Sequence, residues 1–486
     1  MPPSRSESNP LFRQQCYVHG QWVDAGDGKR VPVDNPADGK IIGTVPSLGR
    51  GDIEAAIASG ATGFASWRTR TAQERADQLL RWHRLIEDNR DHIASLMTLE
   101  QGKPLAEAKG EVDYAASFIR WFAEEARRIY GETIPGAKPG QHIVVIRQPV
   151  GVTAAITPWN FPAAMIARKA GAALAAGCSM IVKPATATPY TALALAQLAH
   201  DAGIPPGVLN VVVGDAAMIA DAFTASPVVR KLSFTGSTAV GSRLMAQSAR
   251  HIQKISLELG GNAPFIVFDD ADVERAVEGA MATKFRNTGQ TCVCANRFLV
   301  QSGIHDAFVE RLGQAMAALK VGDGFAEGVT QSALINGAAV AKVRDHYNDA
   351  LVKGARRAWG EEPRGDNGNY VQPVLLTGVT PDMALCREET FGPLAAVLRF
   401  TSEEEAIALA NDTPYGLAAY FYSRDIHRVW RVAEALEAGI VGINEGAISN
   451  AMAPFGGIKE SGLGREGSRH GLDDYTELKY LCMGGA

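Results

Sequence analysis

Cysteine is scarce in this chain, with six residues among 486, and no CxxC pair or HExxH string occurs. This scarcity argues against a disulfide scaffold, and nothing indicates structural zinc or a zinc protease. We therefore expect no metal site and a reducing, cytoplasmic location. The first 15 residues are polar and lack the apolar core of a secretory signal, which agrees with that location.

Long apolar runs and an excess of basic charge are missing too. Arg168 and Lys169 interrupt the most apolar stretch, 166–182, so no run reaches the roughly 18 uncharged residues that a membrane span needs. The net charge is −5. We expect contact with neither a membrane nor nucleic acid, because both partners favour basic surfaces.

The composition is that of an ordinary globular protein, with 46% hydrophobic and 21% charged residues. The length of 486 residues exceeds the roughly 250 to 300 at which one core stops growing, which indicates two large lobes. From residue 150, apolar runs at 150–156, 180–182, 208–213 and 229–234 alternate with helical stretches at 161–176, 189–202, 216–224 and 240–249. This alternation predicts a parallel, doubly wound α/β sheet that binds its ligand beyond the carboxyl ends of the strands.

A second α/β series follows Glu258, with strands at 264–268 and 298–300 around a helix at 272–285. It predicts a second lobe. Two further strand-like segments, 141–148 and 475–481, fit neither series, and our hypothesis is that they form a small projecting sheet used for self-association.

Glycine-rich strings occur in two places. Gly462, Gly464 and Gly467 form a GxGxxG string, but only 19 residues remain after it, too few for the expected strand–helix unit, so we interpret it as a loop. The run 234–237 with Gly241 lies at a strand-to-helix junction, where free N–H groups favour phosphate. Lys183 ends a second strand of the same sheet, where its amine would meet ribose hydroxyls or phosphates; the alternative is a solvated lysine.

Two residues are candidates for chemistry. Cys292, in a Gly/Cys turn at 289–294, becomes a nucleophile only as a thiolate, and the alternative is an inert loop cysteine. Glu258 lies in an apolar setting that ends in glycines, where burial would raise its pKa toward the range of a general base. The alternative for Glu258 is a strand-end carboxylate that faces water.

In this order, the strings resemble motifs of the aldehyde dehydrogenase superfamily over nearly the whole chain. The matching strings are Pro158-Trp159-Asn160-Phe161-Pro162, Lys183-Pro184, Phe234-Thr235-Gly236-Ser237, Leu257-Glu258-Leu259-Gly260-Gly261, Gly289-Gln290-Thr291-Cys292, Glu389-Thr390-Phe391-Gly392-Pro393 and Pro454-Phe455-Gly456-Gly457. The resemblance implies that Cys292 attacks an aldehyde to give a thioester. It also implies that Asn160 and the Cys292 N–H hold the oxyanion, and that Glu258 activates the hydrolytic water.

The resemblance further implies an NAD(P) site lined by Trp159, Lys183, Thr186, Gly236, Ser237, Leu259, Glu389 and Phe391. Many NAD-preferring members of the family carry glutamate where this chain has Thr186. A carboxylate there would repel a 2′-phosphate, whereas threonine can bind it. We therefore expect NADP to be preferred, with NAD also accepted.

The strings 285–297 and 462–468 resemble succinate-semialdehyde dehydrogenases, in which the substrate's far carboxylate is held at positions matching Arg168, Arg286 and Ser449. Arg168 has an alternative as a structural ion-pair partner. Glutarate semialdehyde, one methylene longer, stays open as substrate. Cys294 matches members in which a disulfide with the nucleophile switches activity off; its alternative is a small residue beside the nucleophile.

The implied architecture has a cofactor-binding domain at 1–125 and 150–258 and a catalytic domain at 259–445, with 446–473 returning near the active site. Segments 126–149 and 474–486 are expected to form the oligomerisation sheet. We expect a homotetramer, with a dimer as the alternative. The remaining alternatives are a dehydrogenase of uncharged aldehydes and a non-catalytic nucleotide-binding protein.

Overall fold

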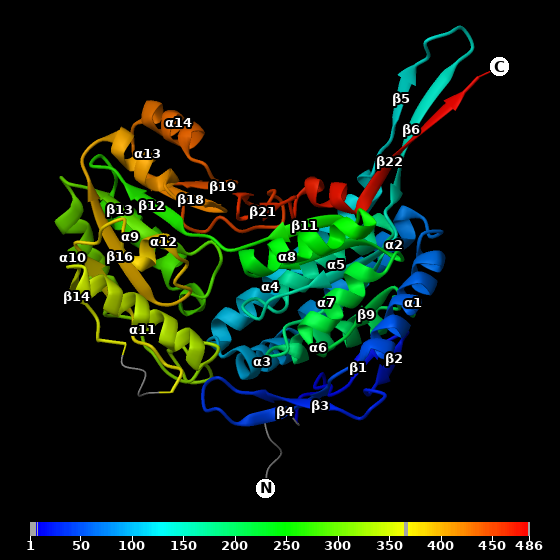
Figure 1. Ribbon diagram of the computed structural model, residues 1–486, viewed down its shortest axis with the longest axis horizontal. Helices are drawn as coiled ribbons and strands as arrows, with labels where there is room; N and C mark the ends of the chain where they lie inside the picture. Colours follow the sequence, from blue (N-terminus) through cyan, green and yellow to red (C-terminus); the bar gives the residue numbers. More distant parts are fainter. Residues whose placement is uncertain (1–5, 7, 364–367, 485–486) are drawn as a thin grey trace.

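The computed structural model describes residue 6, residues 8–363 and residues 368–484. Figure 1 shows two α/β lobes side by side and a narrow three-stranded sheet that projects from one of them. The predicted α/β class with a doubly wound parallel sheet is confirmed. The predicted domain boundaries stay predictions, and their outermost residues, 1–5 and 485–486, lie outside the described part.

The first lobe is built on an eight-stranded sheet, which is parallel from β9 to β11. Its order is β2 (Gln21–Val23), β1 (Cys16–Val18), β9 (Leu209–Val211), β8 (Ser179–Lys183), β7 (Val152–Ile156), β10 (Val229–Thr235), β11 (Lys254–Glu258) and β21 (Gly462–Leu463). The strand order reverses at β7, which has β8 on one side and β10 on the other. This switch point is where such sheets bind ligands.

Helices cover this sheet on both faces, as right-handed crossovers require. The connecting helices are α5 (Ala164–Ala176), α6 (Pro189–Asp201), α7 (Ala216–Ala225) and α8 (Thr238–Ser248). Four helices precede the βα series: α1 (Arg50–Trp67), α2 (Ala72–Asp88), α3 (Arg90–Gln101) and α4 (Leu105–Glu125). Helix α5 begins three residues after the predicted start at Phe161, because Pro162 disfavours helical dihedrals at the residue before it.

The second lobe has a seven-stranded sheet, parallel except for its edge strand β14. Its order is β14 (Arg356–Trp359), β15 (Val374–Thr377), β16 (Leu394–Phe400), β13 (Ala295–Gln301), β12 (Ala263–Val267), β18 (Ala418–Tyr422) and β19 (Ile440–Ile443). Its helices are α9 (Val273–Lys284), α10 (His305–Met316), α11 (Gly337–Val352), α12 (Ala384–Arg387), α13 (Glu403–Asn411) and α14 (Ile426–Ala435). The predicted strands and helix of this lobe therefore lie within or close to β12, α9 and β13.

The projecting sheet joins segments that are far apart in the chain. Strand β22 (Thr476–Met483) pairs antiparallel with β6 (His142–Pro149) along its whole length, and β5 (Glu132–Pro135) flanks β6. The two predicted segments are thus strands of one sheet, whereas β5 was not predicted. Two small antiparallel pairs complete the fold: β3 (Arg30–Asp34) with β4 (Ile41–Pro46), and β17 (Tyr415–Gly416) with β20 (Ile458–Lys459).

The GxGxxG string lies at the edge of the first sheet. Gly462 begins the short strand β21, which pairs antiparallel with β11, and the following residues lead into a 3-10 helix at Arg469–Tyr475. It is not the turn of a βαβ unit, which agrees with its interpretation as a loop. No helix in the described part of the chain is long and apolar enough to cross a bilayer.

Candidate active site

The candidate residues meet where the carboxyl edge of the first sheet faces the amino edge of the second. The ends of β7, β10 and β11 supply residues 158–160, 235–237 and 258–260, and the turn before β13 supplies Cys292. Together they line a cavity of about 400 Å³. Of the predicted site residues, its wall contains Trp159, Asn160, Gly236, Ser237, Glu258, Leu259, Cys292, Glu389 and Phe391.

A constrained turn presents Cys292. Asn287 and Thr288 have φ of 51° and 55°, in the left-handed region that disfavours a β-branched residue such as threonine. Thr288 is held there because its hydroxyl donates to the Ser332 carbonyl at 3.2 Å and accepts from the Ser332 N–H at 3.0 Å. Such local strain, held by neighbouring hydrogen bonds, is typical of functional turns.

The surroundings of Cys292 favour the thiol over the thiolate. Burial, followed by the charge of Glu389, raises the pKa of Cys292 to about 12, and the guanidinium of Arg168 opposes this shift. The backbone N–H of Cys292 lies beside its own sulfur, where it also favours the thiolate. The nucleophile therefore needs a nearby base.

Glu258 is the carboxylate with free oxygens in this cavity. Neither of its oxygens has a hydrogen-bond partner among the described residues, although both are buried. Burial, followed by the charge of Glu466, raises the pKa of Glu258 well above its ordinary value. Glu466 itself stays ionised despite burial, because Lys169 and Arg168 lower its pKa. A carboxyl with a raised pKa can accept a proton near neutral pH.

Asn160 lies close to the turn that carries Cys292. Its side-chain Nδ2 donates to the carbonyl of Gln290 at 3.1 Å. A primary amide has two N–H donors. The second N–H of Asn160 is left for an oxygen in the cavity.

The opposite wall of this cavity has the features of a dinucleotide site. Ser237 is the N-cap of α8, so the free N–H groups of that helix face the cavity, and a side chain at Gly236 would meet the Phe234 ring at 2.4 Å. Glu389 accepts from the Gly261 N–H at 3.2 Å, and burial raises the pKa of Glu389 to about 7. The walls thus combine an anion-binding helix end with a carboxylate acceptor, which fits a nicotinamide dinucleotide.

Trp159 and Phe391 add an aromatic edge, with their rings perpendicular and 5.5 Å apart. Lys183 and Thr186 do not line this cavity. Lys183 ends β8, beside β7, and its Nζ donates to the Pro184 carbonyl at 3.0 Å. Burial lowers the pKa of Lys183 to about 8. Both residues lie at the same carboxyl edge of the sheet, one strand further from the switch point.

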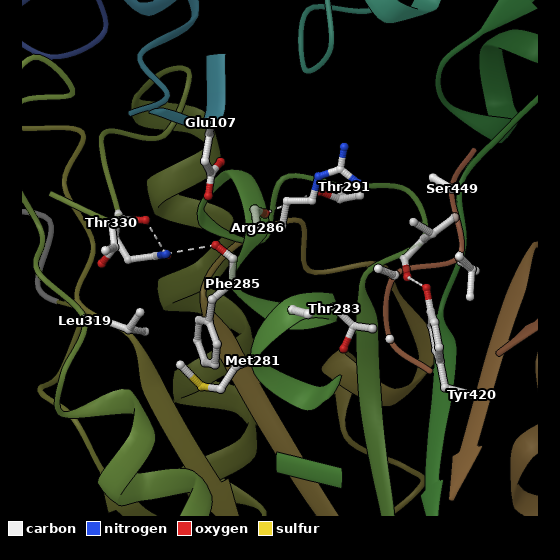
Figure 2. Close-up of a pocket in the computed structure, with 16 residues that line it drawn as sticks. Glu107, Met281, Thr283, Phe285, Arg286, Thr291, Leu319, Thr330, Tyr420 and Ser449 are labelled. Atoms are coloured by element: carbon white, nitrogen blue, oxygen red, sulfur yellow. Dashed lines mark hydrogen bonds between the residues drawn. The ribbon is translucent and has the colours of Figure 1, made fainter. Parts of the chain in front are cut away.

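A second cavity, of about 490 Å³, lies on the other side of the nucleophile turn. Thr291 and Val293, the neighbours of Cys292, line it together with Arg286 and Ser449 (Figure 2). The Arg286 guanidinium packs over the rings of Tyr114 and Phe161, at 5.9 and 4.8 Å. Within the described part of the chain it has no ion-pair partner. Glu107 lies in the same wall and attracts Arg286 at longer range, so this side of Cys292 offers a ligand a cation that forms no salt bridge.

Arg168 does not line either of these two cavities. It is buried, contacts Glu466 at 3.4 Å, and donates to the Tyr114 hydroxyl at 2.7 Å. Its surroundings are thus those of the ion-pair alternative, with its charge also acting on Cys292. Cys294 is turned away from the cavities too, because its sulfur contacts the Lys284 carbonyl at 3.5 Å.

Comparison with known proteins identifies this arrangement. The sequence pattern described as the aldehyde dehydrogenase family matches residues 22–481. The chain belongs to the aldehyde dehydrogenase family. It is therefore an NAD(P)-dependent oxidoreductase, and the predicted family resemblance is confirmed.

Several relatives of this aldehyde dehydrogenase are similar over nearly their whole length. The glutarate-semialdehyde dehydrogenase of Pseudomonas aeruginosa is 59% identical over 475 residues, which cover 98% of both chains. The NADP⁺ succinate-semialdehyde dehydrogenase GabD of Escherichia coli K12 is 59% identical over 479 residues, or 99% of both chains. The crystal structure of a succinate-semialdehyde dehydrogenase from Burkholderia pseudomallei has a TM-score of 0.96 and 57% identity, covering 98% of this chain and 99% of its own.

The sequence reasoning missed several buried charged residues of this aldehyde dehydrogenase. Lys169 and Glu466 form an ion pair beside Glu258, and Lys103 and Glu111 form another beneath Asn160. Lysine and glutamate are almost never fully buried unless paired. The signal available for Lys169 was its position in the apolar helix α5, but its partner Glu466 is distant in the chain and was not predictable from local pattern.

Proposed function

We propose that this aldehyde dehydrogenase oxidises succinate semialdehyde to succinate, with NADP⁺ as the preferred cofactor. The observation that carries the proposal is the Arg286 guanidinium, which has no ion-pair partner among the described residues and lies beside Ser449 in the cavity next to Cys292. An arginine matches a carboxylate through paired hydrogen bonds. Such a site favours an aldehyde whose far end is a carboxylate, as in the substrates named for its relatives.

The residues around Cys292 suggest the following sequence of steps. Glu258, whose oxygens are free, takes the thiol proton, and the Cys292 sulfur attacks the aldehyde carbon. The second Asn160 N–H and the Cys292 N–H hold the resulting oxyanion. The nicotinamide, when bound, supplies the acceptor for the hydride that leaves this carbon. After Glu258 has released the thiol proton to solvent, it takes a proton from the water that attacks the thioester. The C–S bond breaks, the Cys292 thiolate leaves and takes up a proton, and succinate is released.

The preference for NADP⁺ is inferred from Thr186. This half-buried residue follows β8 at the carboxyl edge of the cofactor lobe, and it stands where a glutamate would repel a 2′-phosphate. The Escherichia coli relative, which is named as an NADP⁺ enzyme, supports the same preference. The proposal also includes that the enzyme accepts NAD⁺, with lower kcat/KM than NADP⁺.

Glutarate semialdehyde is the second candidate substrate, because the Pseudomonas aeruginosa relative carries that name at 59% identity. The two aldehydes differ by one methylene, which changes discrimination by about 10- to 200-fold. A ratio of kcat/KM values for the two aldehydes decides between them. A higher value for succinate semialdehyde supports our proposal, and a higher value for glutarate semialdehyde replaces it.

Replacing Arg286 tests the carboxylate site. We expect Arg286→Met to raise KM for succinate semialdehyde strongly while leaving kcat/KM for an uncharged aldehyde such as propanal nearly unchanged. Ser449→Ala should act in the same direction but less, and the surface variant Arg250→Met serves as the control. If Arg286→Met impairs both aldehydes equally, or neither, the proposed carboxylate contact is wrong.

We further infer that the enzyme is a cytoplasmic homotetramer. The three-stranded sheet β5–β6–β22 projects from the first lobe (Figure 1), and its strand β22 exposes Leu478, Tyr480 and Met483. Apolar side chains on an edge strand favour pairing with another chain. The six free cysteines suit a reducing compartment. Light scattering at micromolar concentration tests the assembly, and a monomer there would contradict it.

A further inference from the structure

We propose that Lys103 is a positioning residue for the oxidation reaction, which holds Asn160 so that the side-chain amide stays aimed at the oxyanion. This inference rests on the proposed role of Asn160. It adds a residue that contacts the backbone of Asn160 and not the substrate. Lys103 lies in the short connection between α3 and α4, on the side of Asn160 away from the cavity.

The Lys103 ammonium has three buried contacts. It donates to the Asn160 carbonyl at 2.8 Å, forms an ion pair with Glu111, and lies 4.1 Å from the centre of the Phe161 ring. The side chains of Lys103 and Glu111 are each 1% exposed. A charge-assisted hydrogen bond of this kind is about twice as strong as a neutral one. The peptide that follows Asn160 is therefore fixed in orientation.

Glu111 forms hydrogen bonds with the backbone at the start of α5. Its Oε1 accepts the backbone N–H groups of Ala163 and Ala164, at 2.9 and 3.2 Å. These are free N–H groups at the helix end, where a carboxylate is favoured. The pair thus fixes the segment 160–164 at both ends. Lys103 donates to the Asn160 carbonyl, and Glu111 accepts from N–H groups in the first turn of the helix.

The same connection also reaches the nucleophile turn. Gln101 donates from Nε2 to Asn287 Oδ1 at 3.1 Å, and Asn287 Nδ2 donates to the carbonyls of Asn160 and Gln290, at 3.0 and 3.2 Å. The Asn160 carbonyl thus accepts from both Lys103 and Asn287. Because the Gln290 carbonyl also receives the Asn160 side chain, residues 101–103 set the position of Asn160 relative to the turn of Cys292.

A buried ion pair is an inefficient way to stabilise a fold. Replacing such a pair by apolar residues is often neutral or stabilising, because two charges must be removed from water. Lys103 and Glu111 instead provide directed hydrogen bonds to backbone groups that no apolar side chain could make. Misplacement of a reacting group by about 1 Å lowers rates by about 100-fold. The pair therefore affects the reaction by fixing the orientation of Asn160.

The test compares Lys103→Met with Asn160→Ala and with the double variant. We expect Lys103→Met to lower kcat by about 100-fold with little change in the cofactor Kd. The primary isotope effect with aldehyde-deuterated substrate should rise as the steps at the carbonyl become limiting. Alkylation of Cys292 by iodoacetamide forms no oxyanion and should keep its rate. Lys109→Met, in the helix α4 that follows Lys103 and at a partly exposed ion pair with Asp91, is the matched control.

The double variant Lys103→Met/Asn160→Ala shows whether Lys103 affects turnover through Asn160 or independently of Asn160. If Lys103 acts through Asn160, adding Lys103→Met to Asn160→Ala should lower kcat little further. If the loss of kcat in the double variant equals the product of the losses in the two single variants, the inference is overturned. Near-normal turnover of Lys103→Met would also overturn it. Near-normal turnover of Asn160→Ala would instead overturn the proposed role of Asn160 itself.

A second variant covers the case in which Lys103→Met does not fold, since Glu111 would be left as an unpaired buried charge. Lys103→Met/Glu111→Gln removes both charges but keeps an acceptor for the N–H groups of Ala163 and Ala164. It should fold with a cooperative thermal transition and show the same loss of kcat. Normal turnover in this folded variant would overturn the inference as well.

Discussion

The side-chain amide of Asn160 donates to the backbone carbonyl of Gln290 at 3.1 Å. Gln290 lies two residues before Cys292 in the chain. This hydrogen bond joins the end of β7 in one lobe to the nucleophile turn of the other. It occupies one N–H of the amide and leaves the second for the substrate oxygen. The position of the amide therefore depends on contacts between the two lobes.

Asn160→Ala is expected to lose about 100- to 1000-fold in kcat, the usual effect of removing one oxyanion donor. The affinity for NADP⁺ should change little, because the amide donates to the reacting oxygen. Steady-state rates together with a fluorescence titration of cofactor measure both quantities. Near-normal kcat in this variant would contradict the assignment of Asn160.

The pH dependence of turnover tests Glu258. A general base works only when ionised, and burial raises the pKa of Glu258, so kcat should fall as pH decreases through this raised pKa. The fall should begin at a higher pH than an ordinary glutamate would give. Glu258→Gln should be slow at every pH and lack this limb, whereas the exposed Glu404→Gln should keep it. An acid limb that persists in Glu258→Gln belongs to another group.

Cofactor choice tests Thr186. Thr186→Glu should lower kcat/KM for NADP⁺ far more than for NAD⁺, because the new carboxylate would repel the 2′-phosphate. Thr186→Ser keeps a hydroxyl and should retain the wild-type ratio. Matched kinetics with both cofactors measure the effect. A wild-type enzyme that already prefers NAD⁺ would refute the interpretation of Thr186.

Oxidation tests Cys294. We expect peroxide to inactivate the enzyme, dithiothreitol to restore it, and Cys294→Ala to lose this reversibility, because the nucleophile would then oxidise without a thiol partner. Burial raises the pKa of both Cys292 and Cys294, and Cys294 faces the Lys284 carbonyl, so a disulfide requires the turn to rearrange. Full recovery of Cys294→Ala by dithiothreitol would show that no such switch operates.

The sequence predicted those parts of the fold and site that depend on local pattern. The strands β7, β8 and β10 and their helices follow from apolar runs separated by helical stretches, and motifs at strand ends fall at one edge of the sheet for that reason. Glu258 was expected in an apolar setting, and burial does raise its pKa.

The remaining features depend on contacts between distant segments. The cavity that contains Glu258 and Cys292 is lined by both lobes, and no local pattern sets how the two lobes are placed against each other. For Arg168 the sequence left two alternatives, because a buried arginine on an apolar helix fits both a ligand contact and an ion pair. Its contact with Glu466, nearly 300 residues away, appears only in the folded chain.

The central claim is that Cys292 carries the acyl group of the substrate during turnover. The most direct measurement is peptide mass spectrometry of the wild-type enzyme, mixed rapidly with NADP⁺ and succinate semialdehyde and quenched in acid within the first turnover, because the thioester must form before it is hydrolysed. We predict a succinyl group on the peptide that contains Cys292, absent when NADP⁺ is omitted. Reduced cofactor formed in the same sample while that peptide stays unmodified would contradict the account.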